Sequence, residues 1–190
     1  MSKELKLVSP IAPTVNHYMN YKVGKMRGKN VVIPYPSKET KEYKKYFIPY
    51  VQEEVKKQKW EIDYTGLQHY YVDWIIYFSR VDMDASNQDK VIIDSITESK
   101  AVWLDDNVVC NRVNHIYYDS NNPRIELIIH PVDYIGIFDN QKQLDEFEDK
   151  CKTCNRYGRN CSILLKAKAG RIQEDIIDFE CLKYKKKKEK

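Results

Sequence analysis

Acidic side chains follow two apolar stretches in the middle of the chain. Asp82 and Asp84 come directly after the first stretch, and the pair Asp105-Asp106 comes after the second. In an extended chain the side chains of residues i and i+2 point to the same side, so Asp82 and Asp84 can reach one ion. Carboxylate oxygens are the ligands that Mg²⁺ prefers. The sequence therefore predicts a divalent-metal site built from these aspartates.

Such a site suits the hydrolysis of a phosphodiester bond. One or two ions activate a water molecule and neutralise charge on the attacking and leaving oxygens, and a nearby lysine stabilises charge in the transition state. Asn87, Lys90 and Asp94 are spaced by three and four residues, so we expect one face of a helix to carry all three. The spacing alone also suits a phosphatase or a Ca²⁺ site, and an aspartate at a strand end often only caps a turn or a helix.

The elements that would position these residues can be read from the hydrophobic pattern. Residues 70–78 alternate between two faces and predict a strand, and helical recurrence from about Ser86 predicts a helix after it. Residues 108–118 and 124–130 predict two more strands, and the turn formers between them suit a hairpin. We expect the first of these two strands to pair beside the 70–78 strand and to bring its start near the strand end that bears Asp82.

The N-terminal part adds further elements. Leu5 to Val8 predicts a first strand, and a polar loop through Asn16 and Asn20 and a β-leaning run at residues 31–33 follow it. Ser37 is a plausible cap of a helix that runs to about Lys59. Pro49 is expected to kink this helix or to split it in two. The order of strands and helices indicates an α+β fold with a mixed, mainly antiparallel sheet packed with helices.

The acidic block resembles that of the RusA-type Holliday junction resolvases. That family has a D-x-D-N-x-x-K segment, then a helix with another aspartate, and then a DD pair before a strand. The matching segments here are Asp82-Met83-Asp84, Asn87, Lys90, Asp94 and Trp103-Leu104-Asp105-Asp106, with weaker likeness at residues 13–18, 37–43 and 124–127. The likeness covers roughly residues 5–134. Two departures are that Ala85-Ser86 precede Asn87, and that the DD pair lies one residue further from Asp94.

The resemblance implies a homodimeric, Mg²⁺-dependent endonuclease that resolves four-way DNA junctions by paired symmetric nicks, an activity of DNA recombination and repair. By matching positions, Asp82, Asp84 and Asp106 would bind Mg²⁺ and act in catalysis with Lys90, while Asp94 and Asp105 match further acidic positions. A junction has approximate twofold symmetry, so paired cuts call for two equivalent sites in a dimer. The alternatives are a branched-DNA-binding protein without cleavage activity and a broader phage or prophage nuclease of branched DNA.

Positive charge is distributed unevenly along the chain, whose formal net charge is +4. Residues 183–190 contribute +5, which leaves residues 1–182 near −1, and a basic tail of this kind is usually a solvated, disordered end. The segment from residue 22 to residue 45 contains eight lysines and arginines and only two glutamates. This cluster indicates phosphate binding more strongly than the basic tail does. The candidate DNA-binding residues are Asn16, Lys22, Lys25, Arg27, Lys38, Lys41 and Asn87.

Four of the five cysteines lie in the last quarter of the chain, at positions 151, 154, 161 and 181. Thiolates of Cys151, Cys154, Cys161 and Cys181 can surround Zn²⁺ tetrahedrally, and a segment this small needs such a staple. The alternative is a helical tail that carries reduced cysteines. We therefore expect a RusA-like nuclease domain at residues 1–137 and, at 138–190, a Cys-rich zinc module with a basic tail that serves as an add-on for binding DNA or a partner.

Composition and length set outer limits on these interpretations. At 190 residues with 42% hydrophobic residues, the chain suits one core-forming domain with a small appendage. The start of the chain lacks the order of a signal peptide, and no apolar run reaches the ~18 residues that span a bilayer. We expect a cytoplasmic protein with no membrane partner.

Overall fold

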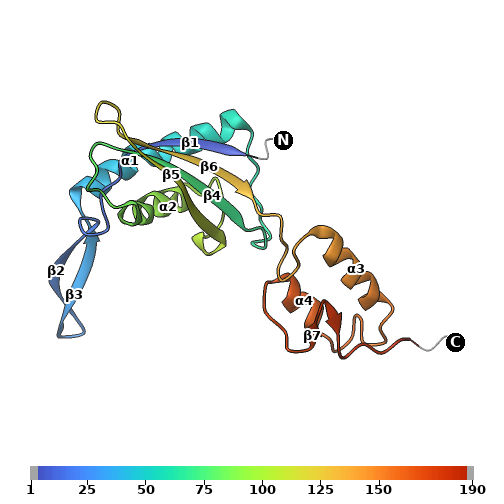
Figure 1. The fold of residues 1–190 in the computed structure, drawn as a ribbon. Helices are drawn as coiled ribbons and strands as arrows, with labels where there is room; N and C mark the ends of the chain where they lie inside the picture. Colours follow the sequence, from blue (N-terminus) through green and yellow to red (C-terminus); the bar gives the residue numbers. More distant parts are fainter. Residues whose placement is uncertain (1–3, 188–190) are drawn as a thin grey trace. The chain divides into compact units, whose positions relative to one another are not determined.

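The computed structural model describes residues 4–187 and divides the chain into two compact units, Met1–Pro131 and Val132–Lys190 (Figure 1). The boundary expected from the sequence lay after residue 137, so residues 132–137 fall in the second unit. Among the residues from 4 to 187, no helix has both the length and the apolar character that crossing a membrane requires.

A four-stranded sheet forms the centre of the first unit. Its order is β1 (Leu5–Pro10), β6 (Arg124–Pro131), β4 (Tyr70–Phe78) and β5 (Val109–Tyr118). The β1–β6 and β6–β4 pairs are antiparallel, and the β4–β5 pair is parallel. The α+β fold with a mixed, mainly antiparallel sheet is confirmed, and the predicted bounds of the 70–78 strand match β4.

The hairpin expected between residues 108–118 and 124–130 is wrong, because β4 lies between β5 and β6. The connection passes the end of β4, where the backbone N–H of Asp119 donates to the carbonyl of Phe78 at 2.7 Å. β4 is the most apolar strand, and the central place lets both of its edges form backbone hydrogen bonds. In the parallel pair Val109 lies beside Tyr70, so β5 starts beside the start of β4. The expectation that β5 would start near the strand end that bears Asp82 is therefore wrong.

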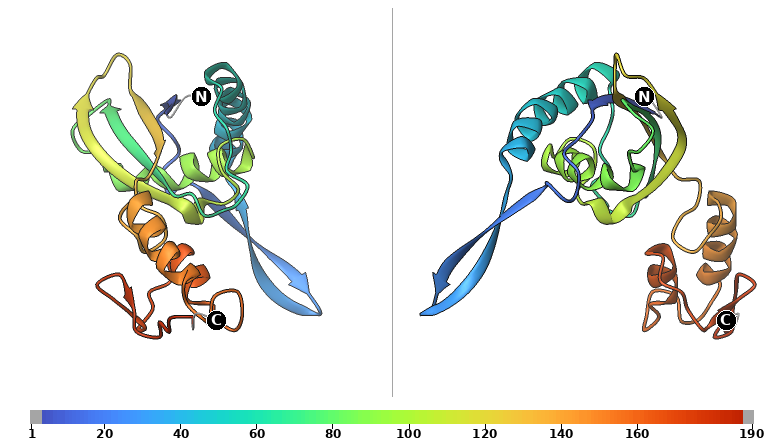
Figure 2. Two further views of the ribbon diagram at one scale, coloured as in Figure 1. Left: turned by 90° about the vertical axis from the view of Figure 1, so that its right-hand side faces the viewer. Right: turned by 60° about the vertical axis from the view of Figure 1, so that its left-hand side comes forward.

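Two helices pack against one face of this sheet (Figure 2). Helix α1 (Lys38–Gln58) buries Phe47 and Val51 completely, and α2 (Asp89–Glu98) buries Val91, Ile92 and Ile96 completely. The alternate side chains of β4 that face them are also buried, which follows from the period-two pattern of the strand. These β4 residues are Val72, Trp74, Ile76 and Phe78.

Helix α1 begins where the sequence predicted and ends at Gln58, close to the predicted end at about Lys59. The Ser37 side chain accepts a hydrogen bond from the Thr40 backbone N–H at 3.1 Å, so the predicted N-cap is confirmed. The helix continues through Pro49, and the expected split is wrong. Proline removes one backbone hydrogen bond, but Phe47 and Val51 on either side of it are fully buried and hold both halves against the core.

A two-stranded arm, β2 (Met19–Met26) and β3 (Lys29–Pro36), projects from the first unit (Figure 1). The strands are joined by Arg27 and Gly28, both with positive φ, a conformation that glycine adopts without cost. The polar loop expected through Asn16 and Asn20 is only partly right, since Asn20 belongs to β2. Most side chains of the arm are exposed, so its packing gave no burial signal in the sequence.

The second unit consists of short elements. These are α3 (Gln141–Lys152), α4 (Ile163–Lys168), β7 (Ile176–Ile177) and β8 (Glu180–Cys181). Its core contains Phe138, Leu144, Phe147 and Ala167. The basic segment after β8 is not a free end: the Lys187 N–H donates to the Thr153 carbonyl, and Lys186 forms a bridge with Cys154. The interpretation of a disordered tail is therefore wrong for residues 183–187, and residues 188–190 lie outside the described residues.

Candidate active site

The first turn of α2 meets the start of β5 at a polar group of three side chains. The Lys90 ammonium is 2.6 Å from a carboxylate oxygen of Asp94 and 4.0 Å from one of Asp106. Asp106 begins the 3₁₀ turn η2 (Asp106–Val108) that leads into β5. A shallow cavity of about 190 Å³ opens here, lined by Asp89, Lys90, Ile93, Asp106, Val109 and Asn111. The structure therefore brings together Lys90, Asp94 and Asp106 from the predicted set.

Hydrogen bonds to Asp94 keep Lys90 and Tyr18 protonated. The bond from Lys90 to Asp94 raises the pKa of Lys90, so this side chain is a cation at neutral pH and cannot serve as a general base. Asp94 also accepts a bond of 2.6 Å from the Tyr18 hydroxyl. Burial and this bond raise the pKa of Tyr18, which stays a hydrogen-bond donor. Asp94 thus holds two donors, and Lys90 can offer its charge to an anion in the cavity.

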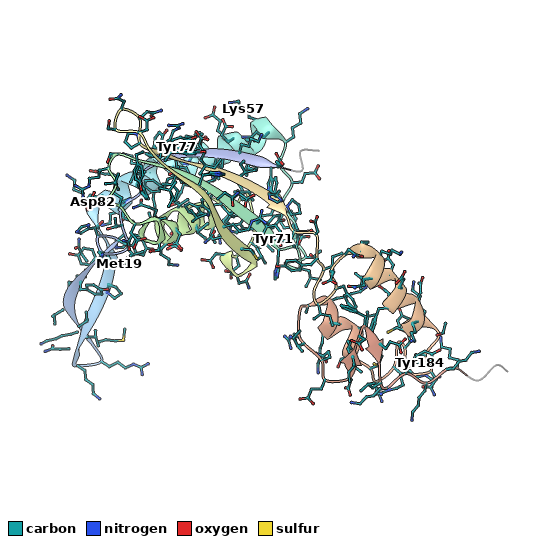
Figure 3. The ribbon with its side chains drawn as sticks, viewed as in Figure 1. Met19, Lys57, Tyr71, Tyr77, Asp82 and Tyr184 are labelled. Carbon is teal, nitrogen blue, oxygen red and sulfur yellow. The ribbon has the colours of Figure 1, made fainter. Side chains whose placement is uncertain are left out.

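Asp82 and Asp84 lie on the loop between β4 and α2 (Figure 3, where Asp82 is labelled). Asp82 pairs with Arg80 at 2.8 Å, and its side chain is 66% exposed. Asp84 caps the 3₁₀ turn η1 (Ala85–Asn87) by accepting bonds from the backbone N–H and the hydroxyl of Ser86. The Ala85-Ser86 insertion thus forms a separate turn before α2.

The insertion changes the position of Asn87. Asn87 ends η1 and precedes α2, so the expectation that it shares a helix face with Lys90 and Asp94 is wrong. Its carbonyl accepts a bond of 3.1 Å from the Val15 N–H, which ties residues 14–17 to this turn. Asn16 in that segment is exposed. The predicted i,i+4 pairing of Lys90 with Asp94 is present.

The carboxylates are chemically suited to Mg²⁺ but are not gathered around one point. Within residues 4–187, no group of three or more His, Cys, Asp or Glu side chains is arranged to hold a metal ion. Asp106 is 40% exposed and Asp82 more so, and both are hard oxygen donors of the kind Mg²⁺ prefers. Asp105 caps η2 and lines a different cavity beside Tyr70 and Trp103. The fit to Mg²⁺ therefore rests on the donor chemistry.

The basic arm is anchored next to this group through Tyr18. The Tyr18 carbonyl accepts bonds from the Ser37 N–H and the Thr40 hydroxyl, both at 3.0 Å, at the point where β3 passes into α1. Its hydroxyl binds Asp94 of α2, as described above. The predicted DNA-binding cations Lys22, Lys25, Arg27, Lys38 and Lys41 are all exposed on the arm and the first turns of α1. Lys22 and Lys41 lie on the Tyr35 ring, each 5.8 Å from its centroid.

A second polar cluster, which no site prediction included, covers the sheet face opposite the helices. The Arg112 guanidinium donates two bonds to Asp73, at 2.7 and 2.8 Å, and lies 3.7 Å from the Tyr71 ring centroid. His130 Nε2 lies 3.0 Å from the same carboxylate. The period-two pattern already placed Tyr71 and Asp73 on one face of the strand, and β5, which carries Arg112, was expected beside it. The sequence did not identify β6, which carries His130, as the other neighbour.

This cluster predicts a pH-dependent contribution to stability. Burial opposes ionisation of Asp73, but the bonds from Arg112 and His130 outweigh it and lower the pKa of that carboxyl below its usual value. A lowered folded-state pKa adds stability above the unfolded value of about 4, and this stability is lost as the pH falls through the folded value. Replacing Asp73 by Asn should cost roughly 1–3 kcal/mol at neutral pH.

The measurement is urea unfolding of wild type and Asp73→Asn from pH 7 to pH 3. All three tryptophans lie buried in the first unit, so their fluorescence reports on it selectively. The difference between the two proteins should shrink as the pH falls below about 4. A difference in the free energy of unfolding that stays constant down to pH 3 would contradict the role given to Asp73.

Two comparisons with known proteins give no match to this chain. No protein-family model matches the chain. A search of curated proteins finds no similar sequence either.

Proposed function

We propose that the first unit is a Mg²⁺-dependent endonuclease that resolves four-way DNA junctions, acting as a homodimer of the RusA type. The main support for this proposal is that Tyr18 links the basic arm to the group formed by Lys90, Asp94 and Asp106. Tyr18 binds Asp94 through its hydroxyl and the start of α1 through its carbonyl. A phosphate backbone held by the arm would therefore lie close to Lys90 and Asp106.

The residues of the chain can divide the work of phosphodiester hydrolysis among them. Asp82, Asp84 and Asp106 would hold Mg²⁺, which would supply Lewis-acid chemistry at the phosphodiester. Lys90 keeps its proton and stabilises negative charge that develops on the phosphoryl oxygens. Asp94 positions Lys90 through the 2.6 Å bond and is itself held by Tyr18.

The arm and the dimer account for substrate choice in this proposal. A four-way junction presents two equivalent phosphodiesters, and a twofold dimer offers two equivalent sites. The exposed lysines and arginines of the arm would position the DNA through its phosphates without reading sequence. Tyr35, which already carries Lys22 and Lys41 on its ring, offers an aromatic surface in the same region.

The second candidate is a structure-specific DNA-binding protein without cleavage activity. It is favoured by the separation of Asp82 and Asp84, which are engaged by Arg80 and Ser86, from the group around Lys90. The basic arm would serve such a protein equally well. Only an activity measurement distinguishes the two.

The test is a cleavage assay with end-labelled synthetic DNA. A four-way junction and a linear duplex of the same sequence are incubated with the full chain and Mg²⁺, with EDTA as the control. We expect paired nicks in opposing strands of the junction, none in the duplex and none with EDTA. Junction binding without nicks at any Mg²⁺ or Mn²⁺ concentration would contradict the endonuclease and support the DNA-binding protein without cleavage activity. Equal cleavage of other branched DNA would indicate the broader nuclease.

The arm predicts a salt-dependent change in affinity. Each phosphate contact contributes about 0.9 to the slope of log K against log salt concentration. Replacing Lys22 and Lys25 by Ala should therefore weaken junction binding and make the magnitude of this slope smaller by about 2. The cleavage rate at saturating protein should not change. Fluorescence anisotropy with a labelled junction at several salt concentrations measures both quantities.

The matched control for the arm variant removes the same amount of charge from α1, outside the arm. Lys56 and Lys57 lie in the last turn of the helix and carry two positive charges, as the arm pair does. Replacing both by Ala should leave the slope close to that of the wild type. An equal loss from both double variants would mean that net charge, and not the arm, governs binding.

A further inference from the structure

The four cysteines of the second unit line one cavity. Its volume is about 270 Å³, and Cys151, Cys154, Cys161 and Cys181 all contribute to its wall. All are free thiols. The remaining lining residues include Phe147, Tyr157 and Tyr184, and no histidine contributes to this wall.

Each thiol comes from a different segment of the second unit. Cys151 lies in the last turn of α3, Cys154 in the turn that follows, Cys161 in the loop before α4, and Cys181 in β8. Cys154 also pairs with the end of the described chain through the bridge to Lys186. A single ion held by all four would therefore join each of these segments to the others.

The elements and the main apolar cluster of the second unit are small. Its main buried cluster consists of Phe138, Leu144, Phe147 and Ala167, and Cys151 and Cys181 pack against the edge of this cluster. Helix α4 has six residues, and β7 and β8 have two each. Units of this size that lack a large core commonly need a metal ion or disulfides for stability.

The Cys154 sulfur has surroundings that suit a thiolate. The backbone N–H of Lys185 donates to the Cys154 sulfur at 3.5 Å. Four thiolates around a divalent ion carry a net charge of −2, and Arg156, Lys150 and Lys183 line the same cavity. Lys150 and Lys183 also pair with Glu180 and Asp175, so the Arg156 guanidinium is the clearest counter-charge.

We propose that the second unit binds one Zn²⁺ ion through Cys151, Cys154, Cys161 and Cys181, and that this ion stabilises the unit. Four sulfur ligands in tetrahedral geometry select Zn²⁺ or an iron–sulfur centre over hard cations. In the described part of the chain the thiols line the cavity wall without meeting as a metal site, so binding draws them toward its centre. The proposal does not depend on nuclease activity.

The experiment measures metal content of the full chain, purified without chelators. Elemental analysis should find about one zinc and no iron per chain. Cys154→Ser and Cys161→Ser should each lose most of this zinc, while Cys110→Ser, which changes the one cysteine in the first unit, should retain it. Iron with the visible absorption of a cluster, or zinc that persists in both ligand variants, would overturn the assignment.

A second readout covers the case in which the ligand variants fail to fold. Wild-type protein is treated with a chelator and then with Co²⁺, whose visible absorption identifies tetrahedral thiolate coordination. We expect that absorption with one equivalent of Co²⁺, its loss on adding Zn²⁺, and faster proteolysis of residues 132–190 in the metal-free protein. A metal-free chain that resists protease equally and gives no cobalt–thiolate absorption would refute the proposal.

Discussion

On the proposed function, Asp106→Asn should abolish Mg²⁺-dependent cleavage of a four-way junction and leave junction binding close to that of the wild type. Asparagine keeps the size of the side chain and removes the negative charge that a divalent cation requires. Asp106 also lies beside Lys90, so its loss removes a carboxylate from the cavity in which the phosphoryl group would sit. The rate should fall by at least about 10²–10³-fold, as on losing one strong electrostatic contact to a transition state.

The neighbouring carboxylate provides the control. Asp105 caps η2 through the Asn107 N–H and lines the cavity on the Tyr70 side. Asparagine is an equally good cap, so Asp105→Asn should fold and cleave nearly as wild type does. Single-turnover cleavage and anisotropy, measured on both variants, separate chemistry from binding.

Two outcomes of these measurements would contradict the assignment of the site. If Asp106→Asn still cuts with Mg²⁺ present, or if both variants lose activity equally, then the acidic group around Lys90 is not the metal site. Asp82→Asn is expected to resemble Asp106→Asn. Full activity of Asp82→Asn alone would place the ligands with Asp94 and Asp106 instead.

The parts of the site that lie close in sequence could be predicted, and the others could not. Lys90 and Asp94 are four residues apart on a helix, which is enough to predict their ion pair. The approach of Asp106 depends on the parallel pairing of β4 with β5, which places the start of β5 at the end of β4 opposite to the predicted one. The residues joined by the Tyr18–Asp94 hydrogen bond are 76 positions apart in the sequence, and no local sequence pattern predicts a contact between residues so far apart.

The same distinction applies to the fold. Alternation of apolar residues predicts β4 because its inner face is buried along its whole length. The turn residues between Tyr118 and Arg124 show that the chain reverses, but they do not show that β4 lies between the two strands. The arm was predicted only in part, from the β-leaning residues 31–33 of β3. Tyr21, Val23 and Val32 are exposed there, so neither face has the buried, apolar pattern of a core strand.

Phe47→Ala should lower the free energy of unfolding of the first unit by about 3–5 kcal/mol, the usual cost of deleting a buried phenyl ring. Phe47 is fully buried on α1, and its ring packs against Tyr43 and Tyr50 at centroid distances of 5.2 and 5.8 Å. Neighbouring side chains close only part of the cavity, so both the transfer and the cavity costs apply. Urea unfolding followed by tryptophan fluorescence measures the loss in this unit alone.

Tyr46→Ala is the matched control, because Tyr46 directly precedes Phe47 on the same helix and is 60% exposed. Its loss should cost less than about 1 kcal/mol, since only an exposed ring contact with Tyr50 disappears. Phe47 does not line the cavity at Lys90, so Phe47→Ala should keep junction cleavage at temperatures where it stays folded. Equal destabilisation by the two variants would mean that α1 does not bury Phe47, and the core that positions Tyr18 against Asp94 would then be wrong as well.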